Sequence, residues 1–215
     1  MNEILKKYSL LENKNVPRET FIEFENFISK LLIKNEEINI ISKKSAKNEV
    51  IRERHIIDSA QIIDFIDLNS NQLTDIGSGG GMPGIIISIL LKNIKKDLKV
   101  NLYEKSHHKS NFLRKVSRDL KLNTEVIQKN IFEVQNIDSG TIMARAFKPL
   151  PIVLELVCKN FKNYKNVIIF MGKNGDKILE EALRDWDFDF EKKISITSRD
   201  SFLLNIKNIK KKIKN

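Results

Sequence analysis

The glycine-rich segment at residues 75–84, Asp-Ile-Gly-Ser-Gly-Gly-Gly-Met-Pro-Gly, constrains the fold of this chain more than any other stretch. Apolar residues precede it and the apolar run 85–91 follows it, so the pattern predicts a strand, a tight turn and a helix. Glycines at positions 77, 79 and 81 allow positive φ and let a ligand approach the backbone closely. In a βαβ unit, such a loop predicts a nucleotide-like cofactor at the switch point of a parallel sheet.

The spacing of these glycines distinguishes between cofactors. A dinucleotide fingerprint has the form Gly-x-Gly-x-x-Gly, which from Gly77 requires a glycine where the chain has Met82. The same form is met when counting starts at Gly79, so an NAD-dependent oxidoreductase stays open on this evidence. The segment begins with an acid, Asp75, and acid-x-Gly-x-Gly-x-Gly resembles motif I of class I S-adenosylmethionine-dependent methyltransferases.

A second acid, Glu104, ends the next predicted strand, residues 99–104. It follows the glycine loop by about twenty residues, the spacing at which a strand-end carboxylate binds the ribose hydroxyls of an adenosine cofactor. A solvated acid at a strand end is the alternative. The combination of Glu104 with the glycine loop favours ribose binding.

Alternating strand and helix patterns predict the rest of the architecture. Residues 16–68 are expected to form two helices, the second over 48–65, with a basic connector at 38–45. From Leu73 onward the alternation predicts a doubly wound α/β fold with a parallel sheet. Strands at 187–195 and 201–206 have no predicted helix between them, which predicts an antiparallel last strand. The lysine-dense tail 207–215 is expected to fray. We therefore divide the chain into a helical extension, 1–70, packed on a cofactor-binding core, 71–215.

Composition adds weaker constraints. The formal net charge of +10 favours a polyanionic partner, although an AT-rich genome also enriches lysine. Cys158 is the sole cysteine, which excludes an internal disulfide, and with three histidines the chain predicts no metal site. No signal-peptide core or membrane-spanning apolar run is evident, so we expect a soluble, cytoplasmic protein without a membrane partner.

Three motifs in order identify a family. Arg54-His55-x-x-Asp58-Ser59, the glycine segment, and Arg145-Ala146-Phe147 resemble the glucose-inhibited division protein B family, with similarity over about residues 38–172. The resemblance implies a bacterial S-adenosylmethionine-dependent methyltransferase that modifies guanine N7 in the decoding-region loop of 16S ribosomal RNA. It also implies a class I methyltransferase, Rossmann-like seven-stranded sheet that is mostly parallel, and S-adenosylhomocysteine as product. The partner is then 16S ribosomal RNA or the small ribosomal subunit, and we expect a monomer.

The resemblance assigns site residues by position. The cofactor residues it implies are Asp75, Gly77, Gly79, Gly81, Met82, Glu104, Ile131, Phe132 and Arg145. His55, Asp58 and Arg145 are the catalytic candidates beside the cleft, and Lys109 occupies a position where the family usually has lysine. A structural pair of His55 and Asp58 on one helix face is the alternative.

Basic residues in the N-terminal part and after the fourth strand are candidates for RNA phosphate contacts. They are Lys43, Lys44, Arg52, Arg54 and Lys148. A solvated charged face is the alternative. Two departures from the family pattern, Lys148-Pro149 and Met171-Gly172-Lys173, weaken the substrate-side assignments, and Lys173 receives no role.

The chemistry implied is simple, because guanine N7 carries a lone pair and no proton. Methylation needs no general base, so positioning and electrostatic stabilisation of the charge that moves to the purine are the expected contributions. Asp58 is expected to stabilise that charge, and Arg145 to anchor a phosphate or the cofactor carboxylate. The alternatives are a small-molecule methyltransferase and a catalytically inactive RNA-binding module on the same scaffold.

Overall fold

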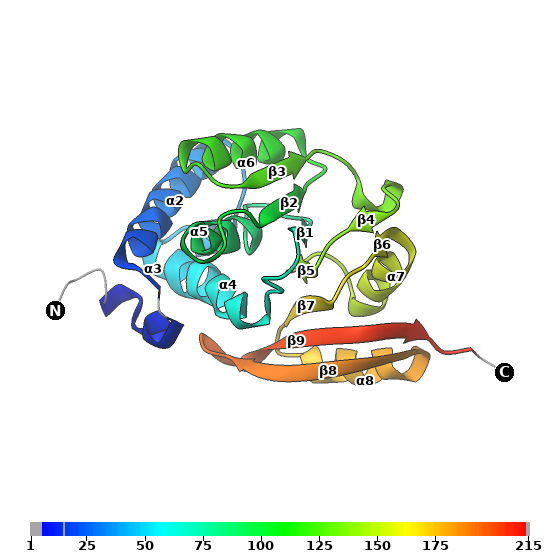
Figure 1. Cartoon of the computed structure of the whole chain (residues 1–215). Coiled ribbons are helices and arrows are strands. Elements are labelled where there is room, and N and C mark those ends of the chain that lie inside the picture. The colour runs from blue at the N-terminus through cyan, green and yellow to red at the C-terminus, as the bar shows by residue number, and fades with distance from the viewer. Residues whose placement is uncertain (1–5, 15, 214–215) are drawn as a thin grey trace.

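The computed structural model describes residues 6–14 and 16–213 and is built around a seven-stranded sheet of order β3-β2-β1-β5-β7-β9-β8 (Figure 1). Neighbouring strands from β3 to β7 are parallel, and β9 is antiparallel to both β7 and β8. The class I methyltransferase sheet predicted from the sequence is therefore confirmed. The strands are β1 (Gln72–Ile76), β2 (Lys99–Tyr103), β3 (Thr124–Ile127), β5 (Thr141–Ala144), β7 (Asn166–Met171), β8 (Trp186–Ser195) and β9 (Ser198–Lys211). A separate parallel pair joins β4 (Ile137–Asp138) and β6 (Phe161–Lys162).

Helices cover both faces of the sheet (Figure 1). The longer helices are α2 (Arg18–Glu37), α5 (Gly84–Ile94), α6 (His107–Asp119), α7 (Leu150–Asn160) and α8 (Gly175–Asp185). The shorter helical segments are η1 (Ser9–Lys14), η2 (Lys43–Ser45), α3 (Asn48–Ile51), η3 (Arg52–Ile57), α4 (Asp58–Ala60), η4 (Gln61–Phe65) and η5 (Ile131–Glu133). Within the described residues, no helix is both long and apolar enough to span a membrane.

Successive strand residues alternate between two hydrophobic clusters, as the two-residue period of a strand requires. On β5, Met143 packs with α2, α5 and α6, whereas Ile142 and Ala144 pack with α7 and α8. The strands buried on both faces therefore read as continuous apolar runs.

Two local predictions are corrected and a third is confirmed with one difference. The helix expected over 48–65 forms without a break, but its hydrogen-bond pattern changes from α-helical to π-helical in η3 and to 3-10 in η4. Helix α8 was not predicted, although Leu179 and Ala182 are buried on it. The tail does not fray from residue 207, because β9 continues to Lys211 and buries Ile209.

Candidate active site

A cleft of about 510 Å³ opens at the carboxyl edge of the parallel strands, where β1, β2 and β5 end. Its volume suits a small-molecule cofactor. Most of the sequence-predicted residues line it: His55, Gly77, Gly79, Met82, Glu104, Lys109, Ile131, Phe132, Arg145 and Lys148. A larger hollow of about 1070 Å³ lies at the opposite edge, near Gln72 and Asn166. None of the predicted site residues lines that hollow, so we place the site at the carboxyl edge.

The glycine loop forms the floor of the cleft. Gly77, Gly79 and Gly81 have φ of 73°, 53° and 91°, which confirms the left-handed turn expected from the sequence. The amides of Gly77 and Ser78 donate to the carbonyl of Tyr103 at 3.0 and 2.9 Å, which fixes the loop against the end of β2. Open space surrounds Gly79, where an added Cβ would meet only the Gly77 carbonyl at 3.7 Å.

Asp75 and Gly81 support this loop from beneath and do not line the cleft, which corrects their assignment as cofactor contacts. Asp75 is 1% exposed, and its Oδ2 accepts from the amide of Gly84 at 3.0 Å, at the start of α5. Burial raises the pKa of Asp75 to about 7. A Cβ at Gly81 would lie 2.6 Å from Ile85, so this glycine permits close packing of the loop on its own helix.

Glu104 lines the cleft beside the glycine loop, at the end of β2. Its Oε2 accepts from the amide of Gly79 at 2.9 Å, and its Oε1 accepts from the amide of Ser106 at 2.7 Å. Each carboxylate oxygen has two lone-pair sites, so both oxygens keep acceptor capacity toward the cleft. The two amides fix the orientation of the carboxylate at the end of β2.

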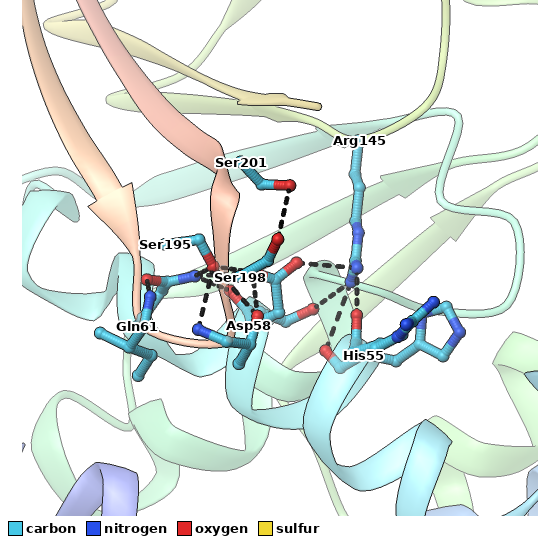
Figure 2. A network of polar contacts seen from close by, with 11 residues as sticks. His55, Asp58, Gln61, Arg145, Ser195, Ser198 and Ser201 are labelled. Carbon is cyan, nitrogen blue, oxygen red and sulfur yellow. Dashed lines mark hydrogen bonds and ion pairs between the residues drawn. The ribbon is translucent and has the colours of Figure 1, made fainter. Parts of the chain in front are cut away.

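Arg145 and Asp58 form a largely buried ion pair at the end of β5 (Figure 2). Arg145 Nη2 lies 2.8 Å from Asp58 Oδ2, with the two side chains 17% and 13% exposed. Arg145 also donates to the carbonyls of Arg54 and His55 and to Ser59 Oγ, so the carbonyls of the η3 turn are held by the strand end. The structure thus brings Asp58, Arg145 and the backbone of His55 together, and their catalytic assignment stays a prediction.

The second oxygen of Asp58 binds the β8–β9 hairpin (Figure 2). Oδ1 accepts from Gln61 Nε2 at 2.7 Å, Ser195 Oγ at 2.9 Å and Thr197 Oγ1 at 3.2 Å. With both of its oxygens bound within the protein, Asp58 joins η4, the hairpin and Arg145. This geometry favours a positioning role for Asp58 over the direct stabilisation of a purine.

His55 lies at the cleft as a neutral imidazole. Burial, together with the charges of Arg145 and Arg54, lowers the pKa of His55 to about 4. Its Nε2 is buried and has no hydrogen-bond partner among the described residues. With a pKa this low, His55 carries no positive charge near neutral pH.

The predicted phosphate contacts separate into two groups. Lys43, Lys44, Arg54 and Lys148 are exposed. Arg52 is not: it is 7% exposed and donates to both oxygens of Glu25 at 2.7 and 3.0 Å, so its assignment as an RNA contact is wrong. The charge of Arg52 is neutralised by this ion pair, which joins α2 to η3.

The sequence analysis missed several residues that line the cleft. Lys105 and Lys129 follow the ends of β2 and β3, and Phe147 follows β5. Their position directly after a predicted strand is the signal that could have identified them, because the carboxyl ends of parallel strands share one edge. Among the described residues no cluster of three or more His, Cys, Asp or Glu side chains could hold a metal ion.

Comparison with known proteins adds independent evidence. Residues 21–205 match the family model GidB, described as rRNA small subunit methyltransferase G. A relative from Pelagibacter ubique named "Ribosomal RNA small subunit methyltransferase G" is 76% identical over 212 residues, covering 99% of this chain and 100% of the relative. A relative of the same name from Rickettsia felis is 35% identical and covers 91% of this chain and 97% of the relative.

Solved structures share the fold at low sequence identity. A SAM-dependent methyltransferase from Aquifex aeolicus has a TM-score of 0.56 and 15% identity, covering 76% of this chain and 95% of its own. The 16S rRNA methylase RmtB has a TM-score of 0.53 and 13% identity, covering 89% of this chain and 75% of its own. At these identities the similarity establishes the fold alone.

Proposed function

The chain belongs to the rRNA small subunit methyltransferase G family, and from this premise we propose that it methylates N7 of a guanine in 16S ribosomal RNA, with S-adenosylmethionine as cofactor. The observation that carries the proposal is the pairing of an open glycine loop with the fixed Glu104 carboxylate in one cleft. We place this activity in the cytoplasm, with the protein acting as a monomer.

The cleft residues fit the cofactor. Glu104 would hold the ribose hydroxyls, and Ile131 with Phe132, after β3, would enclose the adenine. The uncrowded Cα of Gly79 leaves room for a ligand beside the loop. When bound, S-adenosylmethionine supplies an electrophilic methyl group on a sulfonium.

The protein's own contribution is positioning. Guanine N7 has no proton to lose, and the neutral His55 with the hydrogen-bonded Asp58 agrees with a site that needs no general base. Arg145 supports the reaction by fixing the η3 turn, which carries His55 at the cleft. The exposed Lys43, Lys44, Arg54 and Lys148 would bind phosphates around the target base.

Transfer of a tritiated methyl group to small ribosomal subunits from cells that lack this protein tests the proposal. After digestion to nucleosides, label in 7-methylguanosine is the expected result. Cofactor binding without transfer to any RNA would contradict it and favour a small-molecule substrate. Absence of cofactor binding would favour an inactive RNA-binding module.

A matched pair of variants tests the cofactor site. We expect Glu104→Gln to weaken S-adenosylmethionine binding about tenfold in calorimetry, because it removes a charged acceptor for the ribose hydroxyls. Glu125→Gln, on the exposed side of β3, is the control and should bind as wild type does. Equal affinities for the three proteins would exclude Glu104 from the cofactor site.

A further inference from the structure

Phe147 has an aromatic ring in the cleft that the cofactor assignments leave unexplained. It follows Arg145 and Ala146 after β5, and Ala146 adopts the left-handed conformation with φ of 48°. This conformation is costly for a residue with a side chain, so it marks a backbone turn that the surrounding structure enforces. The turn leaves Phe147 half-buried as part of the cleft lining.

The ring lies directly against the glycine loop. A Cβ added to Gly77 would be 2.2 Å from Phe147 Cδ2, so the glycine leaves space for this ring. Phe147 also stacks with Phe132, with ring centroids 5.9 Å apart and an interplanar angle of 17°. Phe132 is 40% exposed and both rings line the cleft, while Phe147 also packs against the hydrophobic cluster beneath it.

The sheet order indicates which part of the cleft Phe147 borders. The proposed cofactor contacts Gly77, Glu104 and Ile131 follow β1, β2 and β3 in turn, whereas Phe147 follows β5, on the opposite side of β1. Because its ring reaches Gly77 and Phe132, Phe147 borders the proposed cofactor position from the β5 side. The β5 side, which His55 and Lys148 also line, is left for the methyl acceptor.

We propose that the Phe147 ring stacks on the target guanine, an inference that rests on the proposed function. Enzymes that modify a base remove it from its stack and hold it against aromatic side chains. In the transfer, the N7 lone pair forms the bond to the methyl carbon while the carbon–sulfur bond breaks. The electron pair of that bond goes to sulfur, and no proton moves.

The reaction leaves a positive charge on the purine, and this favours an aromatic neighbour. The face of a phenyl ring attracts a cation, so Phe147 stabilises the guanine more strongly as methylation proceeds. A ring in this position therefore lowers the barrier to transfer besides orienting the base. Phe147 thus acts on kcat as well as on KM.

Leucine and tyrosine substitutions test the stacking. We expect Phe147→Leu to lower kcat/KM for methylation of small ribosomal subunits about ten- to hundredfold, the range of one base–aromatic stack. S-adenosylmethionine affinity, measured by calorimetry, should stay within about threefold of wild type, and Phe147→Tyr should retain activity. Phe190→Leu is the matched control, because Phe190 is 43% exposed on β8 and does not line the cleft.

Two outcomes of these assays would overturn the inference. One is a Phe147→Leu protein within twofold of wild type in kcat/KM. The other is a loss of cofactor affinity as large as the loss of activity, which would place the ring against the cofactor instead of the guanine.

Fluorescence provides a readout that needs no turnover. Trp186 is the sole tryptophan and is buried, so it gives a constant background in Phe147→Trp and in the control Phe190→Trp. With saturating S-adenosylhomocysteine, unmethylated small subunits should quench the tryptophan at 147 and not the one at 190. Equal signals from the two variants would exclude stacking.

The fluorescence test is independent of the test of the proposed function. Wild-type protein that transfers no label would contradict the proposed function, and the quenching measurement would still decide whether Phe147 contacts the RNA.

Discussion

Asp75 shows how one buried acid stabilises the cleft without entering it. Its carboxylate binds the amide of Gly84 and so fixes the start of α5 relative to the end of β1. Burial shifts the pKa of Asp75 from 3.8 to about 7, so the folded protein retains a proton that the unfolded chain loses above pH 4. Because the folded state binds more protons between these values, this residue's contribution to stability falls as pH rises from about 4 through 7.

Asparagine at this position removes the pH dependence while keeping an acceptor for the Gly84 amide. We expect Asp75→Asn to unfold with a free energy close to that of wild type at pH 4.5. At pH 8 the variant should be more stable than wild type, by up to about 4 kcal/mol. Urea denaturation at the two pH values measures the difference. A variant that is less stable than wild type at pH 8 would contradict a raised pKa.

At the residue scale, sequence spacing predicted where a residue lies better than it predicted which way the side chain points. Gly77, Met82 and Glu104 were located correctly at the cleft because loop and strand ends follow directly from hydrophobic patterns. Arg52 and Asp75 were assigned wrongly, because their directions depend on partners such as Glu25 and Gly84. Glu25 lies 27 residues from Arg52, and no local pattern connects them.

At the scale of elements, the Asp58–Arg145 pair joins the η3 turn, the end of β5 and the β8–β9 hairpin. Replacing Asp58 with asparagine leaves the buried guanidinium without its counter-ion. We expect Asp58→Asn to lower the free energy of unfolding by about 3 kcal/mol, the cost of breaking a buried pair, and to reduce methylation as the η3 turn loosens.

Thermal and chemical denaturation distinguish this positioning role from a chemical one. The exposed Asp187 on β8 provides a control, and Asp187→Asn should change stability by less than about 0.5 kcal/mol. An Asp58→Asn protein of wild-type stability that cannot methylate would instead place the Asp58 carboxylate in the chemistry.

Most elements followed from periodicity, and the exceptions have physical causes. Helix α8 was missed because the charged segment 172–185 carries few apolar residues, although Leu179 and Ala182 make one buried stripe. The helix expected over 48–65 is present, and only the π-helical hydrogen-bond pattern of η3 was not predicted; its His55 carbonyl accepts from Arg145, 90 residues away in sequence. The lysines of β9 appeared disordered by composition, yet antiparallel pairing with β8 orders them as far as Lys211.

For the whole molecule, the N-terminal helices and the sheet share one hydrophobic cluster. Phe24 and Phe27 of α2 pack in the same cluster as Ile87 of α5 and Leu113 of α6. The division at residue 70 was made from patterns along the chain, and it stays a prediction about two parts with different roles. Their shared cluster indicates that they depend on each other for stability.

Truncation tests this dependence. We expect a fragment of residues 71–215 to lack a cooperative thermal transition, because removing α2 exposes the apolar faces of α5 and α6. Near-ultraviolet circular dichroism of the fragment and of the full chain gives the comparison, with Trp186 and the tyrosines as reporters. A fragment with a native-like spectrum and a sharp transition would show an independent core.

The side chains that bind Asp58 also determine when this part of the protein can assemble during synthesis. The partners of Asp58 include Arg145 and Ser195, and Ser195 lies 137 residues after Asp58 in the sequence. A nascent chain emerges from the ribosome with its N-terminal part first, so the η3 turn is exposed long before the hairpin that secures it has been translated. The order of synthesis therefore leaves the contacts of Asp58 incomplete until residues 195–197 have been translated, long after the glycine loop and β5.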